Sequence, residues 1–352
     1  MQVGAAKRYP TENLMLTLPY HFALALYGPD ATSVGTAPAT HDWTLAHEWT
    51  RFHFQRRGEL PLDANGDASV LPLWNRQLGE PYCRGYHVEI SRPGQRPVSA
   101  DFPVTDFAVS ARQAASLFIE RQELREGERY SYLLLAYPAP KESAAEDGLS
   151  VTNASPRMPV GDASLGALRA RAESVGVQDG DDLPVFVSRQ VLREAEAQTA
   201  AEHGIETGGI LIGMLWRDEA AGEIFVEVTA QIPAEHSRAT SVKLTFTPET
   251  WTAADAALRL RRRGEIYLGY WHSHAVGEWC KARECTAEKQ KTCPLAKDFF
   301  SEDDEAVMRA AFPRAYSIGL VANDTAFSPL TFSMFGNREG TFQPRGFCVL
   351  ED

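Results

Sequence analysis

Residues 266–274 read IYLGYWHSH, and this stretch decides both the expected fold and the expected chemistry. The apolar run predicts a buried strand that ends in His272-Ser-His274. Side chains at positions i and i+2 of a strand point to the same side, so the two imidazoles are expected to face one point. Two converging imidazoles are typical of a site for a divalent metal.

A carboxylate further along the chain is expected to complete this site. Ser301 is predicted to begin a helix, and Asp304 lies on its first turn, so both side chains can face the metal. Two histidines and one carboxylate leave a fourth zinc position for water, which is the arrangement of a catalytic site. Asp303 is a rival for the carboxylate ligand, and Asp298 is a weaker one.

Residues 206–213 read ETGGILIG and predict a second strand, with a carboxylate at its start. Glu206 is the candidate general base, which would orient the water and pass its proton to the leaving nitrogen. The glycines would let neighbouring backbone approach closely. The hydroxyl of Ser301 is the candidate donor to the oxyanion of a tetrahedral intermediate.

The length of 352 residues favours two domains. We expect a small α+β domain at residues 1–138, and a linker at 139–182 that includes a short helix at 165–173. The second domain is expected at 183–352, with a cysteine-containing insertion at 275–300. Its fold class is expected to be α+β or α/β, with a mixed sheet flanked by helices.

Composition and hydrophobic pattern limit the expected location of the protein and the classes of partner that it can bind. The net charge of -12 argues against a nucleic-acid partner, which would require a basic surface. The apolar run at residues 14–27 is too short to span a bilayer and predicts a buried strand, so no membrane partner is expected. Five cysteines make a poor disulfide framework and favour the cytoplasm.

Three of the cysteines, Cys280, Cys285 and Cys293, fall within fourteen residues of the insertion. Thiolates at this density are candidates for a second, structural zinc that folds the loop. A fourth ligand could come from Cys348, His236 or Glu284. The alternative is three reduced cysteines without metal. Core packing is the favoured role of Trp271 and Trp279, ahead of substrate stacking.

Taken together, the Glu206 strand, His272-Ser-His274 and Ser301-Glu-Asp-Asp304 resemble the JAMM/MPN zinc metalloprotease family, in particular bacterial JAB deubiquitinase-like members. The resemblance covers roughly residues 183–350. It implies an MPN fold related to cytidine deaminases, a catalytic Zn²⁺ held by His272, His274 and Asp304, and hydrolysis at the C-terminus of ubiquitin or a ubiquitin-like protein. AMSH-type deubiquitinases resemble the chain further, because they carry a zinc-stabilised insertion beside the active site.

The chain departs from the family pattern at two places. Ala275 stands where family members often have proline, which alters the stiffness of the loop and leaves ligation intact. The gap of 26 residues between His274 and Ser301 is longer than the usual spacer, so Asp304 is assigned across an insertion.

The expected function is therefore that of a zinc-dependent isopeptidase or peptidase that cleaves amide bonds at the C-terminus of a ubiquitin-like protein, in deconjugation or precursor processing. One alternative is a zinc hydrolase of small peptides or amino-acid adducts, and another is a non-catalytic MPN scaffold subunit. The N-terminal domain is expected to recognise substrate or a partner. Activating and conjugating enzymes of the same pathway are the other expected partners.

Overall fold

The computed structural model describes residues 16–64, 67–139, 158–202, 204–235, 238–239, 244–286, 288–289, 293, 299–325 and 329–351. Contacts between Cα atoms divide the chain into two compact units. Unit 1 comprises Met1–Gln55 and Glu59–Arg157, and unit 2 comprises Arg56–Gly58 and Met158–Asp352. The expected division into functional domains stays a prediction, and each unit is described by itself.

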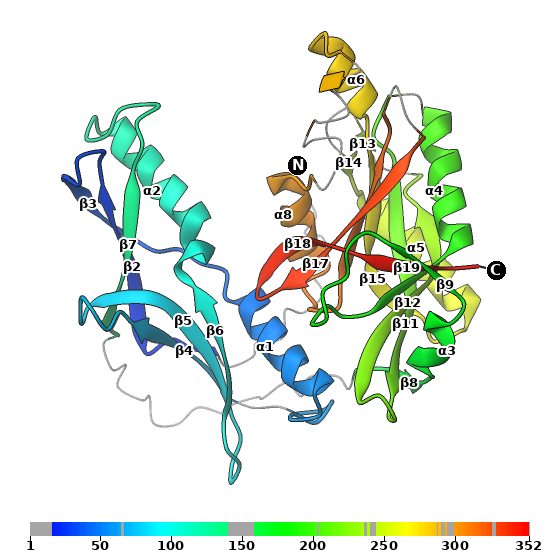
Figure 1. The fold of residues 1–352 in the computed structure, drawn as a ribbon, viewed down its shortest axis with the longest axis horizontal. Coiled ribbons are helices and arrows are strands. Elements are labelled where there is room, and N and C mark those ends of the chain that lie inside the picture. Colours follow the sequence, from blue (N-terminus) through cyan, green and yellow to red (C-terminus); the bar gives the residue numbers. More distant parts are fainter. Residues whose placement is uncertain are drawn as a thin grey trace, which may run out of the picture. The chain divides into compact units, whose positions relative to one another are not determined.

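Unit 1 is a single sheet covered by helices (Figure 1). Its described strands are β1 (Leu16–Thr17), β2 (Tyr20–Tyr27), β3 (Ser33–Pro38), β4 (Asp67–Trp74), β5 (Tyr82–Ser91), β6 (Val98–Pro103) and β7 (Ser131–Pro138). Its described helices are α1 (Thr44–Arg56), the 3-10 helix η1 (Val104–Phe107) and α2 (Ala108–Glu120). The strand order is β1-β4-β5-β7-β2-β3, with β6 paired to β5.

The core of unit 1 forms where α2 packs on this sheet. Ala111, Ala114 and Phe118 of α2 are buried against Leu24 of β2 and Tyr86 of β5. The small side chains on one side of α2 let the helix lie close to the strands, and burial of the apolar surface stabilises the arrangement. The apolar run that was expected to form one buried strand forms the short β1 and the longer β2 within the described residues.

Unit 2 carries the predicted metal ligands. Its described strands are β8 (Val160–Asp162), β9 (Ala172–Val175), β10 (Val185–Ser188), β11 (Gly208–Asp218), β12 (Glu223–Pro233), β13 (Arg238–Ala239), β14 (Leu244–Thr245), β15 (Ile266–His274), β16 (Ile318–Asn323), β17 (Thr331–Arg338), β18 (Thr341–Arg345) and β19 (Phe347–Leu350). Its described helices are α3 (Leu165–Arg169), α4 (Arg189–Glu202), α5 (Pro248–Arg261), α6 (Val276–Ala282) and α8 (Glu302–Ala311).

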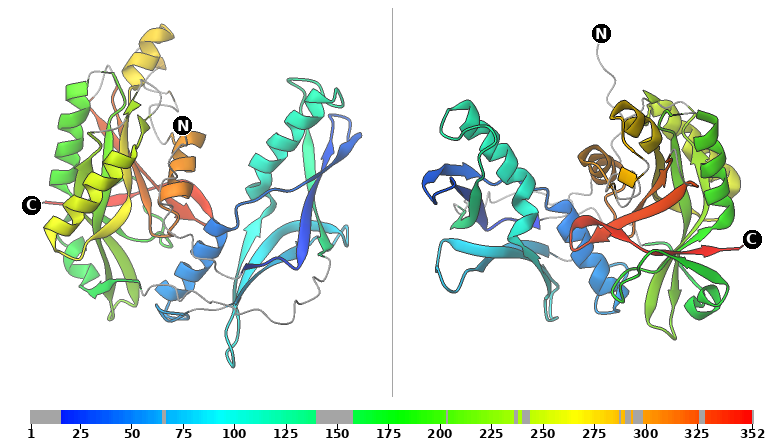
Figure 2. Two further views of the ribbon diagram at one scale, coloured as in Figure 1. Left: turned by 180° about the vertical axis from the view of Figure 1, so that it is seen from behind. Right: turned by 45° about the horizontal axis from the view of Figure 1, so that its top comes forward.

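Most of these strands form one mixed sheet in the order β18-β17-β16-β15-β11-β12-β10-β19-β9, with β8 paired to β11. Helices α4 and α8 lie on opposite sides of this sheet (Figure 1, Figure 2). The mixed sheet flanked by helices confirms the expected class for this half of the chain. Strand β15 is central, because it pairs antiparallel with β11 and parallel with β16.

The register of β11 and β15 brings distant residues together. Gly208 pairs with His272, so the start of β11 lies beside the end of β15. Glu206 precedes Gly208 by two residues and therefore lies next to the two histidines at the same edge of the sheet. This is the geometric reason why a glutamate more than sixty positions away in sequence belongs to the site.

Two details differ from the sequence predictions. Residues 160–175 were expected to belong to a linker, but they form β8, α3 and β9, and the two strands pair with β11 and β19. These strands are three and four residues long and lack a periodic pattern, so only their partners define them. The remaining linker residues 140–157 lie outside the described residues.

Strand β18 was not predicted. It contains Pro344 and lies at the end of the strand order, where a residue without an N–H is tolerated. Helix α5 ends at Arg261, and Arg262 follows it in the left-handed conformation (φ 50°). No helix within the described ranges is both long and apolar enough to cross a membrane.

Candidate metal centre

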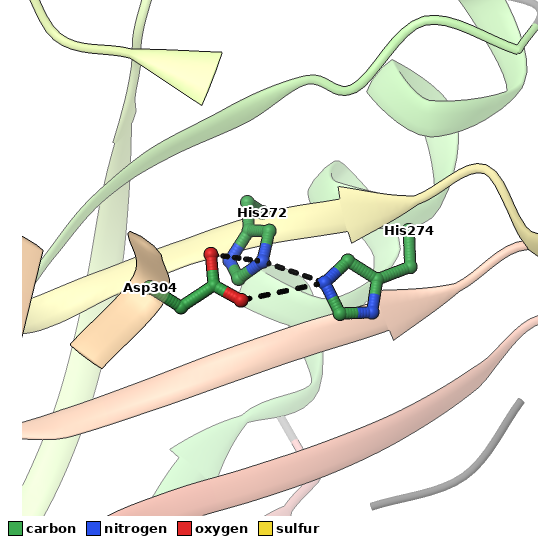
Figure 3. Close-up of side chains that lie close together, drawn as sticks. All are labelled: His272, His274 and Asp304. Atoms are coloured by element: carbon green, nitrogen blue, oxygen red, sulfur yellow. Dashed lines mark hydrogen bonds and ion pairs between the residues drawn. The ribbon is translucent and has the colours of Figure 1, made fainter. Parts of the chain in front are cut away.

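The side chains of His272, His274 and Asp304 converge on one point (Figure 3). The Nε2 atoms of the two histidines are 3.0 Å apart. Asp304 Oδ1 lies 3.1 Å from His272 Nε2, and Asp304 Oδ2 lies 3.6 Å from His274 Nε2. The three ligand atoms all lie within 4.8 Å of one another. The structure therefore brings together the three ligands predicted from the sequence.

Aromatic rings surround both imidazoles. Tyr270 stacks on His272, with ring centroids 5.2 Å apart and an angle of 18° between the planes. His274 packs against Trp279 at 5.1 Å and Phe299 at 5.5 Å. Both histidines are buried, and burial lowers the pKa of His274. A neutral imidazole is the form that binds a metal ion.

Asp304 is positioned by the helix that carries it. Ser301 is the N-cap of α8, and its Oγ accepts a hydrogen bond from the Asp304 N–H at 3.1 Å. In return, the Ser301 N–H and hydroxyl donate to Asp304 Oδ2 at 2.8 and 2.7 Å. This reciprocal capping box fixes the carboxylate at the first turn of the helix.

The electrostatic surroundings keep Asp304 ionised. Burial by itself would raise the pKa of its carboxyl group, but the neighbouring His272 and the hydrogen bonds to the carboxylate hold it well below its usual range. Asp303, the rival predicted from the sequence, also lines the groove but is not part of the converging group. The other rival, Asp298, lies outside the described residues.

Glu206 lies at the same edge of the sheet, two residues before the start of β11. Its side chain is only 5% exposed, and it lines a groove together with His272, His274 and Asp304. Burial raises the pKa of Glu206 to about 7; the neighbouring His272 opposes this rise and Asp304 adds to it. A carboxyl group with a pKa near neutrality is suited to both accept and donate a proton.

The donor atoms fit a zinc ion. Two imidazole nitrogens and one carboxylate oxygen are the ligands of many catalytic zinc sites, and these three types of atom converge here. The opposite ring nitrogens, the Nδ1 atoms, differ from those of most zinc-binding histidines. Neither His272 Nδ1 nor His274 Nδ1 has a hydrogen-bond partner among the described residues, whereas zinc-binding histidines commonly donate from this atom.

The groove around these residues has a volume of about 1030 Å³. Its lining includes apolar and aromatic residues of β14, α5, α8 and the segment after β14. These residues are Leu244, Phe246, Trp251, Val307, Ala310 and Ala311. Residues of α6, and residues that follow α6 or precede α8, also line the groove, including Trp279, Arg283 and Phe299. The cavity is large enough for a segment of polypeptide.

The three cysteines of the insertion belong to one apolar cluster. Cys280 is buried with Val276, and Cys285 and Cys293 pack against them. Among the residues that the structure describes, however, only His272, His274 and Asp304 gather as a metal-binding group. The second, structural zinc therefore stays a prediction.

Two of the candidates for a fourth ligand to that second zinc, Cys348 and Glu284, are described by the structure, and neither belongs to the cysteine cluster. Cys348 lies in a different apolar cluster with Phe186 and Phe225. Glu284 follows α6 and is exposed, and His236 lies outside the described residues. The structure thus gives no support to any of the three as the missing ligand.

Tyr270 is also a part of this site, although it was not predicted from the sequence. Its hydroxyl donates to the backbone carbonyl of Asp304 at 3.2 Å and lies 3.5 Å from Asp304 Oδ1. The signal was available, because Tyr270 precedes His272 by two positions and therefore shares its side of the strand. Trp271 points elsewhere: it is fully buried and donates to Gln231 Oε1 at 3.1 Å, which confirms core packing.

A comparison with known protein families finds a match within unit 2. Residues 188–278 match the family described as prokaryotic homologs of the JAB domain. The matched segment contains Glu206, His272 and His274 and ends before Ser301 and Asp304. This match supports a place for unit 2 in the JAB/MPN family. The family includes peptidases as well as non-catalytic members, so the match leaves the choice between hydrolase and scaffold open.

Among solved structures, the chain is similar to the solution structure of a protein from Desulfitobacterium hafniense. The two sequences are 17% identical, the similarity covers 48% of this chain and 94% of the other, and the TM-score is 0.30. The comparison with curated proteins finds no match.

Proposed function

We propose that this protein is a zinc-dependent isopeptidase or peptidase that cleaves an amide bond at the C-terminus of a ubiquitin-like protein. The observation that carries the proposal is the convergence of His272, His274 and Asp304 within 4.8 Å, with the buried Glu206 lining the same groove. A scaffold has no need for two buried imidazoles, a buried glutamate and a partly buried aspartate in one groove, because burying such groups is costly.

His272, His274 and Asp304 would hold the zinc ion in this proposal. When bound, zinc acts as a Lewis acid that polarises the scissile carbonyl and makes water nucleophilic near neutral pH. Glu206 accepts the proton of the attacking water and delivers it to the departing nitrogen. The pKa of about 7 suits both transfers, since the carboxylate must gain and then lose the proton within one turnover.

Ser301 has a more complex role than the sequence suggested. Its hydroxyl proton is donated to Asp304 Oδ2 at 2.7 Å, so in this arrangement the hydroxyl has no second proton for an oxyanion. The oxyanion role therefore requires the hydroxyl to rotate away from Asp304 when substrate binds. Until then, Ser301 acts as the N-cap that fixes the carboxylate.

The direct test is an assay on ubiquitin-like fusions and conjugates after zinc loading. The wild-type chain is expected to cleave them, and Glu206→Gln is expected to lose at least about 100-fold in kcat, the range of general acid–base catalysis. Glu202→Gln, an exposed residue on α4, is the matched control and should keep full activity. Absence of cleavage by the wild type, or full cleavage by Glu206→Gln, would refute the proposal.

A second candidate is hydrolysis of small peptides or amino-acid adducts by the same residues. The groove favours a substrate with several residues in contact, because apolar residues such as Trp251 and Ala311 line it together with His272, His274 and Asp304. A short peptide cleaved with the same kcat/KM as the protein substrate would favour the small-molecule alternative. A chain that binds no zinc at all would favour the scaffold.

Recognition of the substrate or of a partner by residues 1–138 is part of the proposal. Activating and conjugating enzymes of the same pathway are the partners that such chemistry requires. If deletion of this region leaves the turnover of a protein substrate unchanged, the recognition role is wrong while the catalytic proposal stands.

A further inference from the structure

Tyr270 connects the two elements that supply the metal ligands. His272 and His274 come from β15, whereas Asp304 comes from α8, beyond a gap of 26 residues. Chain connectivity therefore does not fix the carboxylate relative to the imidazoles. The Tyr270 hydroxyl spans the two elements, since it donates to the Asp304 carbonyl at 3.2 Å and lies 3.5 Å from Asp304 Oδ1.

The ring of Tyr270 makes a second connection. It lies against His272 at 5.2 Å with the planes 18° apart, and against Phe312, just after α8, at 6.0 Å and 16°. Phe246 meets it edge-on at 5.6 Å and 85°. Only 2% of the Tyr270 surface is exposed, so packing holds the ring in place. A fixed ring restricts the orientation of the side chains that pack against it.

This stacking matters because His272 lacks the usual restraint on its ring. Metal-binding histidines are commonly oriented by a hydrogen bond from the second ring nitrogen. His272 Nδ1 has no such partner among the described residues, so packing must orient the imidazole instead. The Tyr270 ring lies nearly parallel to the His272 ring. The ring of Phe300, another aromatic neighbour of His272, is tilted by 51° at 6.2 Å.

We propose that Tyr270 is a positioning residue for the metal centre: its hydroxyl orients Asp304, and its ring orients His272, so that both ligand atoms face the ion. The inference rests on the metal site of the proposed function. It assigns Tyr270 no contact with the substrate and no part in proton transfer.

The test is Tyr270→Phe, which keeps the ring and removes the hydroxyl. The affinity for Zn²⁺ is measured by competition with a chromophoric chelator, and the site geometry by the absorption bands of bound Co²⁺. We expect the Kd for Zn²⁺ to rise about 10-fold, as for other outer residues that orient metal ligands. The Co²⁺ bands should shift, while the Tm of the metal-free protein should stay close to that of the wild type.

Tyr267→Phe is the matched control. Tyr267 lies on the same strand, and its hydroxyl donates to Asp255 Oδ1 at 2.5 Å, away from the metal ligands. This variant loses an equivalent hydrogen bond, so its Zn²⁺ affinity and Co²⁺ bands should match the wild type. A third variant, Tyr270→Leu, also removes the ring and should weaken Zn²⁺ binding more than Tyr270→Phe.

The outcomes separate the two proposals. If Tyr270→Phe binds Zn²⁺ as tightly as the wild type and Tyr267→Phe, with unchanged Co²⁺ bands, the positioning role is wrong and the metal site remains. If the wild type itself fails to bind Zn²⁺, the metal site and the role of Tyr270 are both overturned. A failure of Tyr270→Leu to fold would leave the decision to Tyr270→Phe.

Discussion

Ser273 and Thr207 are joined by two hydrogen bonds that tie the segment of Glu206, the proposed general base, to the segment of His272 and His274. The Ser273 hydroxyl accepts from the Thr207 N–H at 2.9 Å, and the Ser273 N–H donates to the Thr207 carbonyl at 2.8 Å. Ser273 lies between the two histidines, and Thr207 follows Glu206. The middle residue of the His-Ser-His motif thus has a structural task of its own, which is to hold the start of β11 beside the end of β15.

Replacing Ser273 by alanine should reduce turnover through Glu206. The partly buried Thr207 N–H would lose its side-chain partner, and a carboxylate displaced by a fraction of an ångström is a poorer base. We expect kcat to fall on the order of 10-fold, with KM and zinc content unchanged. Ser273→Thr keeps the hydroxyl and should stay near the wild type. Equal kcat in Ser273→Ala and the wild type would show that the hydrogen bond from the Thr207 N–H to the Ser273 hydroxyl is not needed for turnover.

The choice between Asp304 and Asp303 can be tested by zinc content. Asp304→Asn removes a charged ligand and should weaken Zn²⁺ binding by about 10-fold or more. Asp303→Asn changes the neighbouring carboxyl group, which also lines the groove, and should leave zinc binding intact. Elemental analysis after dialysis against a chelator gives the readout. Loss of zinc from the Asp303 variant alone would reverse the assignment.

Gly209 should tolerate no side chain, because β11 is in close contact with its neighbours there. A Cβ atom would lie 2.6 Å from the Ile232 carbonyl oxygen and 2.7 Å from Trp271 Nε1. Gly209→Ala is therefore expected to lower the free energy of unfolding by about 1–3 kcal/mol, as overpacking does. The control is Gly180→Ala, where a Cβ meets nothing within 4 Å. Denaturant titration of the two variants should separate them clearly.

Glu265 should contribute stability that depends on pH. Its side chain is 1% exposed; it accepts hydrogen bonds from Arg261 Nε at 2.6 Å and from the Thr229 hydroxyl at 2.5 Å. The hydrogen bond from Arg261 lowers the pKa of Glu265 below the usual 4.5, and burial opposes this. Its stabilising effect is thus complete above pH 4.5 and is lost as the pH falls through the lower folded-state pKa.

The variant Glu265→Gln should test this linkage. It is expected to lower the free energy of unfolding by about 1–2 kcal/mol at neutral pH, and by progressively less in acid. Glu219→Gln is the control, since Glu219 is 77% exposed. Urea unfolding from pH 7 to pH 3 measures the effect. A constant difference between Glu265→Gln and the wild type over this range would contradict the expected linkage.

If the cysteines of the insertion bind a structural zinc, the protein should bind a second equivalent of metal there. Replacing Cys280, Cys285 and Cys293 together by serine should remove that equivalent and leave the metal held by His272 and His274. Cys83→Ser is the control, because Cys83 is buried in unit 1. If the wild type binds a single equivalent and the triple variant binds the same amount, the cysteines are reduced apolar packing and the prediction is wrong.

The sequence by itself determined the parts of the site that depend on local geometry. The spacing of His272 and His274 on a strand places both imidazoles on one side. The spacing of Ser301 and Asp304 defines a helix N-cap with its carboxylate on the first turn. Both relations are set within a few residues, so no distant contact was required to predict them.

The tertiary structure alone decided the relations that depend on register and packing. Pairing of Gly208 with His272 brings Glu206 close to the candidate metal ligands, and the position of α8 places Asp304 rather than Asp303 in the converging group. The task of Tyr270, and the short strands β8, β9 and β18, also become visible only from their partners. The physical reason is that hydrogen bonds between strands and the burial of side chains join residues far apart in the chain. The energies of these contacts depend on the partners, so they cannot be read from a few neighbouring residues.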